Sequence, residues 1–274
     1  MLETLLVAVD FSPSWPRLER QLVRLRGLGC KRLALVHVIA SGYGQVPPMT
    51  HREHYAEQLE TAAAALHEAG FEQVDTEVRV GQVGVELEHA AAGLGAGAIV
   101  AGTRGHRTLR SLLLGNTVHA LARTATRPLL LIPTADDIDL PSAHLCRPML
   151  ATDGSAAARA AEEAFIALLP ACQRGLIVAV VGPDANAAGH EDDPDIEAHL
   201  ASLCERCASP GCDQSVIPDG NAAAAIASLA AAKDIDLIVL GKRGRNPARD
   251  LLLGRTAEAV CQHAGRMVLL VPAT

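Results

Sequence analysis

Aromatic residues are scarce in this sequence of 274 residues. Three Phe, two Tyr and one Trp make up 2% of the chain, which argues against a ligand site built on aromatic stacking, including the usual platforms for single-stranded nucleic acid. Positive charge is also in deficit, because 24 Lys and Arg face 31 Asp and Glu, for a net charge of −7. We therefore expect no general electrostatic attraction to nucleic acid or to an anionic membrane.

Long hydrophobic runs are also missing. The longest, such as 176–181 and 237–240, have the length of strands and fall far short of the ~20 residues that cross a membrane. The first residues lack a basic segment and Asp10 ends their apolar run, so no signal peptide is expected. The seven Cys are an odd number in a long chain, which fits a reducing compartment. These features predict a globular cytoplasmic protein.

A duplication organises the chain. Asp10 and Asp153 end similar apolar runs and lie 143 residues apart, while Gly102 and Gly241 open similar loops 139 residues apart. The repeated unit has the length of a whole domain and not of a solenoid module. We therefore expect two domains, 1–140 and 147–274, on either side of a seam rich in Asp, Pro and Ser.

Strand-like and helix-like patterns alternate within each repeat. In the first repeat we expect strands at 4–9, 32–39, 76–80, 98–101 and 129–132, and helices at 15–28, 51–69, 83–94 and 116–123. Five apolar strands separated by helix-length segments indicate a parallel sheet with helices on both faces, and right-handed crossovers make that sheet doubly wound. The fold class is therefore α/β, with two tandem five-stranded domains. Ligands of such sheets bind beyond the carboxyl ends of the strands.

The most informative motif is a glycine loop that follows a predicted strand. Gly102 and Gly105 precede Gly115 with nine residues between the last two, and the same spacing recurs in Gly241, Gly244 and Gly254. Glycine tolerates positive φ and lets the backbone approach a ligand closely. Gly115 and Gly254 each precede a predicted helix, whose first N–H groups suit a phosphate.

Side chains around the two loops support the same interpretation. Asn116 and Thr117 can cap a helix or donate to a phosphate. Cations also gather at the loops: Arg104, Arg107 and Arg110 in the first, and Lys242, Arg243, Arg245, Arg249 and Arg255 in the second. The alternative is that the glycines only make tight turns and the arginines are solvated. Together with Asp10 at a strand end, the loop favours phosphate binding in the first repeat.

The Asp10-Phe11-Ser12 strand end and the Gly102 to Asn116 loop resemble the universal stress protein family, over nearly the whole chain as a tandem pair. The resemblance implies a domain that, in the ATP-binding branch, holds ATP without a P-loop. It implies that Asp10 contacts the adenosine and the backbone of Val38 the adenine. It further implies that the ribose, the phosphates and a divalent metal such as Mg or Mn are held by Gly102, Gly105, Gly115, Asn116 and Thr117.

The corresponding second site consists of Asp153, Val180, Gly241, Gly244, Gly254, Arg255 and Thr256. Arg255 departs from the family, whose ATP-binding members usually have Ser, Thr or Asn there. This cation can clamp a phosphate, fill the pocket, or pair across the domain interface. We therefore expect an adenine nucleotide mainly in the first domain, as a regulatory state with at most slow hydrolysis. The resemblance also implies a pseudo-twofold pair in which 129–132 and 268–271 approach each other, and it is compatible with a homodimer.

Three other functions are weighed. The spacing of His199, Cys204, Cys207 and Cys212 suits zinc, although the first two Cys share an apolar helical face with Leu200 and Leu203, which favours a role as small core residues. A nucleotide-free scaffold for a protein partner or an apolar ligand is a second alternative. An ATP-consuming enzyme is a third, but we find no P-loop, no nucleophile elbow and no catalytic constellation.

Overall fold

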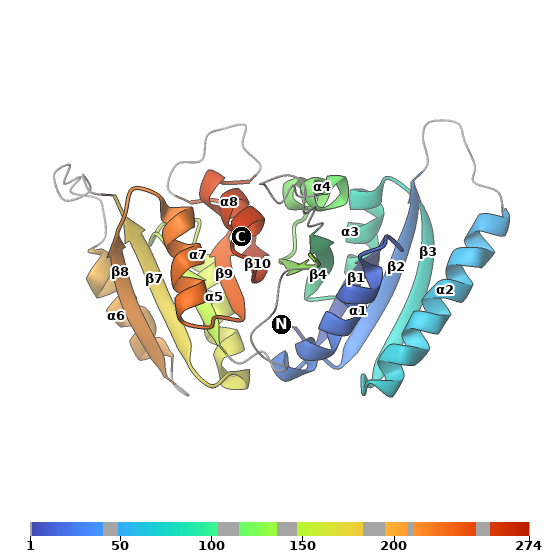
Figure 1. Cartoon of the computed structure of the whole chain (residues 1–274), viewed down its shortest axis with the longest axis horizontal. Helices are drawn as coiled ribbons and strands as arrows, with labels where there is room; N and C mark the ends of the chain where they lie inside the picture. Colours follow the sequence, from blue (N-terminus) through green and yellow to red (C-terminus); the bar gives the residue numbers. More distant parts are fainter. Residues whose placement is uncertain are drawn as a thin grey trace. The chain divides into compact units, whose positions relative to one another are not determined.

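Each repeat folds as an alternation of parallel strands and helices, shown in the computed structural model of Figure 1. The structure describes residues 2–40, 49–103, 115–135, 147–182, 195–207, 211–244 and 253–273. The chain divides into two compact units, the described residues up to Ala135 forming one and those from Arg147 forming the other. The α/β class expected from the sequence is confirmed.

The described residues of the first unit form ten elements. In chain order they are β1 (Thr4–Val9), α1 (Trp15–Leu22), the 3₁₀ helix η1 (Val23–Leu28), β2 (Arg32–Ala40), α2 (Met49–Glu68), β3 (Gln73–Gly81), α3 (Val83–Gly93), β4 (Ala98–Thr103), α4 (Asn116–Thr124) and β5 (Leu129–Pro133).

The second unit repeats this order. Its elements are β6 (Pro148–Ala151), α5 (Arg159–Leu168), the 3₁₀ helix η2 (Leu169–Ala171), β7 (Gly175–Val181), α6 (Ile196–Arg206), β8 (Cys212–Pro218), α7 (Ala222–Ala232), β9 (Leu237–Gly241), α8 (Arg255–His263) and β10 (Met267–Val271).

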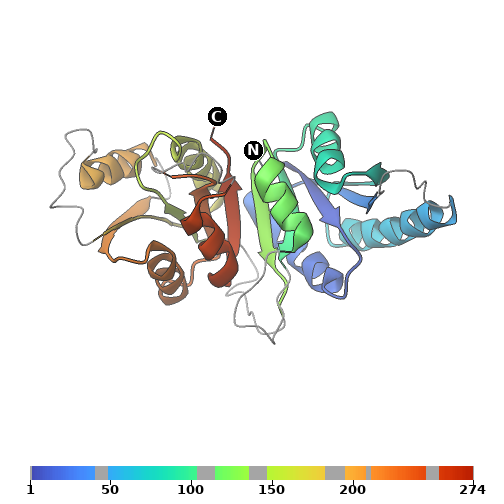
Figure 2. The same cartoon turned by 90° about the horizontal axis from the view of Figure 1, so that it is seen from above.

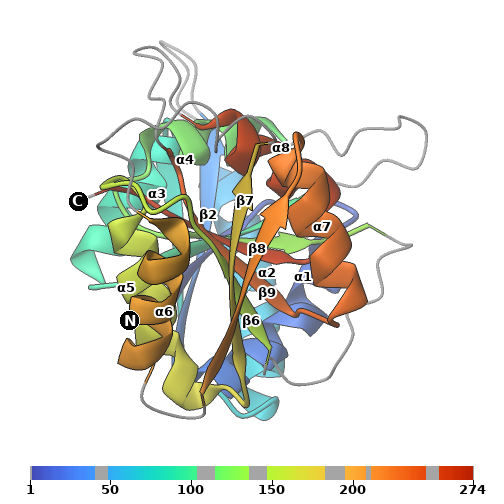
Figure 3. The ribbon, with the colours of Figure 1, turned by 90° about the vertical axis from the view of Figure 1, so that its left-hand side faces the viewer.

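The two sheets have the same topology. Neighbouring strands run in the order β3-β2-β1-β4-β5 in the first unit and β8-β7-β6-β9-β10 in the second, and their pairings are parallel. Figure 2 shows α1 and α3 on opposite sides of the first sheet. Figure 3 shows α5 and α6 on one side of the second sheet and α7 and α8 on the other. The strand order reverses between β1 and β4 and between β6 and β9, which is where a doubly wound sheet binds ligands.

The burial of the strands matches the apolar runs of the sequence that form them. Every residue of β5 and of β10 is buried. In contrast, β3 and β8, at the opposite end of each unit's strand order, carry many half-buried and exposed residues. No helix among the described residues is long and apolar enough to cross a membrane.

One helix differs from its sequence prediction. The α-helix expected at 15–28 ends at Leu22 and continues as the 3₁₀ helix η1. Gly29 then adopts a left-handed φ of +81°, and its N–H donates to the carbonyl of Arg26. A glycine at this position allows the chain to leave the helix tightly and enter β2. The packing of the two units against each other stays a prediction.

Candidate functional site

Both units form the same turn at the carboxyl end of the first strand. The backbone N–H of Ser12 donates to Asp10 Oδ1 at 3.0 Å, and the N–H of Ser155 donates to Asp153 Oδ1 at 3.0 Å. The residue between Asp and Ser has positive φ in both units, +48° at Phe11 and +72° at Gly154. The aspartates predicted from the sequence are therefore fixed at equivalent places, beside each sheet's reversal of strand order.

The second unit has a cavity of about 750 Å³ at this place. It lies at the carboxyl ends of β6, β7 and β9 and reaches the start of α8. Its lining includes every residue of the second predicted site: Asp153, Val180, Gly241, Gly244, Gly254, Arg255 and Thr256. The structure thus brings together residues that are up to 103 positions apart in the sequence.

Close backbone approach explains the glycines of this loop. A Cβ at Gly241 would lie 2.9 Å from the carbonyl oxygen of Arg243, and one at Gly244 would lie 2.6 Å from Asp153 Oδ2. Neither these glycines nor Gly254 adopt positive φ, so close approach and not backbone conformation is what glycine provides here. The N–H of Gly254 donates to the Lys242 carbonyl at 2.8 Å, which draws the two ends of the loop together.

The rim of this cavity carries positive charge and unpaired amides. Arg243 and Arg255 line the cavity and are exposed, so Arg255 does not fill it. Neither arginine forms an ion pair with another residue that the structure describes. Gly254 caps α8 without a side-chain hydrogen bond, so the first amides of this helix have no side-chain acceptor there. This arrangement suits an anionic group such as a phosphate.

The first unit has a smaller cavity, of about 220 Å³. Asp10, Val38, Gly102 and Thr117 line it, as the sequence predicts. Gly115 occupies the cap position of α4, and Asn116 is the first residue of that helix, so neither Asn116 nor Thr117 stands at the cap position. Several predicted loop residues lie outside the described part of the chain: Gly105, Arg104, Arg107, Arg110, Arg245 and Arg249.

Two repeat positions near the cavities differ in side-chain size. Trp15 stands in the first unit where the second has Ala158, and both line their cavities. His37 pairs in register with Val9, which places it at the position of Ala179 in the second unit. His37 lines the first cavity, whereas Ala179 does not line the second.

His37 belongs to an aromatic cluster that the composition did not suggest. Its ring centroid lies 4.0 Å from that of Tyr55, and Phe11 stacks on Tyr55 with centroids 5.8 Å apart. Phe11 also contacts Trp15 edge to face. Three of the six aromatic residues of the chain thus gather around His37, and of these Trp15 lines the first cavity together with His37. The low aromatic content is therefore a poor guide to this site, because it says nothing of where the few rings gather.

The surroundings of the buried His37 imidazole favour its neutral form. Desolvation lowers its pKa, and this effect outweighs the hydrogen bond to Val9 and the nearby charge of Asp10. Its Nδ1–H donates to the carbonyl oxygen of Val9 at 2.8 Å. His37 therefore holds the end of β1, just before the Asp10 turn, through a neutral hydrogen bond.

The zinc arrangement considered for the second unit does not form. The thiol of Cys212 contacts those of Cys204 and Cys207, but His199 bonds to a glutamate instead. Burial is the main cause that raises the pKa of all three thiols. In the described part of the chain, no group of three or more His, Cys, Asp or Glu side chains is arranged to hold a metal ion.

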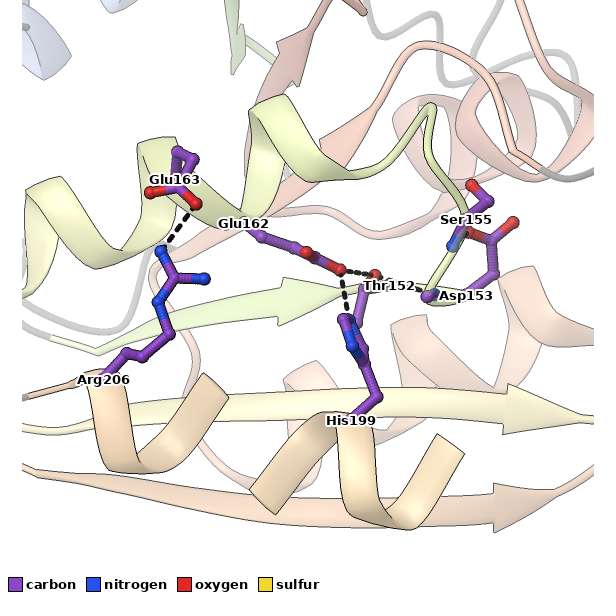
Figure 4. Close-up of polar contacts among 8 residues, drawn as sticks. Thr152, Asp153, Ser155, Glu162, Glu163, His199 and Arg206 are labelled. Atoms are coloured by element: carbon purple, nitrogen blue, oxygen red, sulfur yellow. Dashed lines mark hydrogen bonds and ion pairs between the residues drawn. The ribbon is translucent and has the colours of Figure 1, made fainter. Parts of the chain in front are cut away.

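A buried polar network that was not predicted from the sequence joins the second cavity to α6 (Figure 4). Glu162 on α5 is 3% exposed, and its Oε1 accepts hydrogen bonds from the Thr152 hydroxyl at 2.6 Å and from His199 Nε2 at 2.9 Å. Thr152 lines the cavity. The available signal was a lone acid on the apolar face of α5, between Ala161 and Phe165.

Comparisons with known proteins agree with this geometry. The model of the universal stress protein family matches residues 1–133 and 147–272. A universal stress protein from Archaeoglobus fulgidus DSM 4304 is similar over 98% of this chain and 96% of its own, at 20% identity and a TM-score of 0.74. A structure described as a putative universal stress protein from Pseudomonas aeruginosa UCBPP-PA14 is similar over 98% of this chain and 93% of its own, at 17% identity and a TM-score of 0.64.

A third similar structure is described as a universal stress protein in complex with cAMP. It matches 49% of this chain and 98% of its own, at 20% identity and a TM-score of 0.39. Comparison with curated proteins gave no match.

Proposed function

Because the chain belongs to the universal stress protein family, we propose that it binds an adenine nucleotide and that the cavity of the second unit is its main site. The observation that carries this proposal is the 750 Å³ cavity, which is lined by Asp153 together with the Gly241 to Thr256 loop ends. Its volume falls within the ~300–1,000 Å³ of typical small-molecule sites, whereas the 220 Å³ of the first cavity falls below it. The proposal therefore departs from the sequence-based expectation of a main site in the first domain.

The lining supports a specific orientation of the nucleotide. Val178, Val180 and Ile226 offer an apolar surface for the base, and Asp153 offers a carboxylate to the ribose hydroxyls. Arg243, Arg255 and the first amides of α8 offer positive charge and donors to the phosphates. In this proposal Arg255 clamps a phosphate, which makes its departure from the family pattern compatible with binding.

We propose binding as a regulatory state, with at most slow hydrolysis. Among the described lining residues Asp153 is the only carboxylate, and it already accepts the Ser155 N–H. The described lining contains no His or Cys that could act as base or nucleophile. Bound Mg or Mn would neutralise phosphate charge.

The proposal also keeps several predictions that were made from the sequence. The first unit keeps Asp10 and Val38 at its cavity, and we propose that Trp15 and His37 restrict it to a smaller ligand than a whole nucleotide. Domain limits of 1–140 and 147–274, regulation through a protein partner and a cytoplasmic location complete the proposal. The six cysteines in the described part of the chain are free thiols, which fits a reducing compartment.

Calorimetric titration of the full chain with Mg·ATP tests the site. We expect binding by the wild type and no binding by Ala158→Trp, which places in the second cavity the residue that occupies the first. Ala156→Trp is the matched control, because Ala156 is exposed two positions away and does not line the cavity. If Ala158→Trp fails to fold, Ala158→Leu provides a smaller filler. Unchanged ATP affinity in a folded Ala158 variant would contradict the proposed site.

A further inference from the structure

The buried carboxylate of Glu162 connects two helices to one strand end. Its Oε1 accepts both hydrogen bonds of the network, from Thr152 after β6 and from His199 on α6. Because an ionised carboxylate only accepts, the Thr152 hydroxyl and the His199 Nε2–H must both be donors. With Glu162 buried, the loss of either donor leaves part of its charge unpaired.

The network continues into the turn that presents Asp153. The single hydroxyl proton of Thr152 is used by Glu162, so the oxygen lone pairs face the N–H of Gly154, which donates to Oγ1 at 3.1 Å. The backbone N–H of Thr152 donates to the Val178 carbonyl at 3.0 Å. Thr152 is thereby held on three sides, and the next residue along the chain is the aspartate of the cavity. Figure 4 shows Thr152 between Glu162 and the Asp153 turn.

The first unit lacks the hydrogen-bond network that surrounds Glu162 in the second. Val9 stands where the second unit has Thr152, so no hydroxyl is present, and Glu19, at the position of Glu162, is only half-buried. There the strand end is held by His37 through the Val9 carbonyl. The network is thus a property of the second cavity and not of the repeated fold.

We propose that Glu162 is a positioning residue of the second cavity: with His199 it holds Thr152, and through Thr152 it fixes the Asp153 turn in the geometry that binds the nucleotide. This proposal rests on the proposed nucleotide site. The network couples α6 to the cavity. The side chain of His199 is 26% exposed, whereas Glu162 and Thr152 are buried. A change at His199 on the outer helix therefore alters nucleotide affinity without touching the nucleotide.

The same two helices carry a matched control. Arg206 on α6 and Glu163 on α5 form an ion pair at 2.6 Å, with side chains 45% and 63% exposed. This pair also joins α5 to α6, but neither residue lines the cavity or contacts Thr152 in the described structure. Glu163→Gln therefore tests whether the loss of any contact between α5 and α6 is enough to lower nucleotide affinity.

Calorimetric titration of the full chain with Mg·ATP gives the first test. Thr152→Val removes the hydroxyl at nearly constant size, and we expect roughly tenfold weaker binding, as for the loss of one hydrogen bond to a charged group. Thr152→Ser restores the hydroxyl and should restore the affinity, while Glu163→Gln should leave it unchanged. Wild-type affinity in Thr152→Val would overturn the proposal.

A double-mutant cycle separates positioning from a general loss of packing. Thr152 and His199 both bond to Glu162, so His199→Ala should weaken Mg·ATP binding, and the double variant should lose no more than the larger single loss. Losses that multiply would overturn the shared role. Thermal unfolding of each variant checks that the loss of affinity does not follow loss of stability, and Glu162→Gln serves if Thr152→Val does not fold.

Amide hydrogen exchange in the nucleotide-free protein keeps the two proposals distinct. We expect the Gly154 N–H to exchange faster in Thr152→Val than in the wild type, because its acceptor has been removed, and no change in Glu163→Gln. Unchanged exchange would overturn the positioning role even if ATP binds. If the wild type does not bind Mg·ATP, the proposed function fails and the link to affinity fails with it, whereas the exchange result still decides whether Glu162 and Thr152 fix the turn.

Discussion

At the scale of single residues, the absence of one methyl group decides where Asp153 can lie. A Cβ on Gly244 would sit 2.6 Å from Asp153 Oδ2, so the glycine leaves room for the carboxylate. This contact links the glycine loop to the strand end across the cavity. It also explains why a glycine without positive φ is needed at this position.

Gly244→Ala should therefore impair binding more than stability. The new methyl group displaces the Asp153 carboxylate, and we expect Mg·ATP affinity to fall at least tenfold by calorimetry, about 1.4 kcal/mol. Because the displaced atom ends a half-buried side chain, thermal unfolding should change little. Gly220→Ala is the control, since a Cβ there meets nothing within 4 Å. Equal affinities for the two variants would contradict the assigned contact.

A second prediction at this scale concerns the buried thiol of Cys261. Burial raises its pKa to about 12 in the folded chain. The folded state therefore keeps its proton at pH values where the unfolded thiol, with a pKa of ~8.5, has lost it. The free energy of unfolding should fall as the pH rises from about 9 toward 12, by at most about 1.4 kcal/mol per pH unit for this group.

Urea unfolding at several alkaline pH values measures this dependence. Cys261→Ala should show a shallower fall of unfolding free energy with pH than the wild type. Cys172→Ala, at a half-buried position, serves as the control and should keep most of the wild-type slope. Identical slopes for the wild type and Cys261→Ala would show that this thiol does not contribute.

At the scale of elements, α5 and η2 pack closely against the start of β7. A Cβ on Gly175, the first residue of β7, would lie 2.6 Å from Leu169 Cδ2 and 2.8 Å from Phe165 Cζ. Phe165 is fully buried and Leu169 is 1% exposed, so neither side chain has free space to move into. Gly175 thus sets the distance between helix and sheet.

Gly175→Ala should destabilise the second unit by about 1–3 kcal/mol through overpacking. Leu169→Ala makes room at the same contact, so the double variant should lose less stability than the two single losses combined. Chemical denaturation of the three variants measures both effects. Strictly additive losses would show that Gly175 and Leu169 do not share this contact.

Much of the order of strands and helices could be predicted from the sequence, because each buried strand is a short local run of apolar residues. The runs ending at Asp10 and at Gly102 were strands in the right places, and the repeat offset carried the prediction to the second unit. The end of α1 was not predicted, because Leu25 and Leu28 keep an apolar periodicity through the 3₁₀ helix η1. A 3.6-residue pattern does not reveal that change of helix type.

The residues that line the second cavity were predicted as a possible second site, but the size of that cavity was not predicted. Asp153 and the three glycines of the second loop were identified from spacing alone, yet the size of each cavity depends on side chains from other elements. Trp15 and Ala158 differ at one repeat position, and Glu162 meets His199 from another helix. Such contacts between elements leave no spacing signal in a single sequence.

At the scale of the whole molecule, the two repeats have diverged into different cavities on one fold. The first is the smaller and is lined by Trp15 and His37, and the second is the larger and is lined by Asp153 and two arginines. The chain contains a single Trp, and it lies at the first cavity. Its fluorescence therefore reports on the first site and not on the second.

One titration tests the central claim most directly: Mg·ATP is added to the full chain while calorimetric heat and Trp15 emission are recorded under the same conditions. We predict saturation at one nucleotide per chain with Trp15 emission unchanged, because the nucleotide occupies the second cavity. A change in Trp15 emission that follows the heat with the same dissociation constant would place the nucleotide in the first unit and contradict the account.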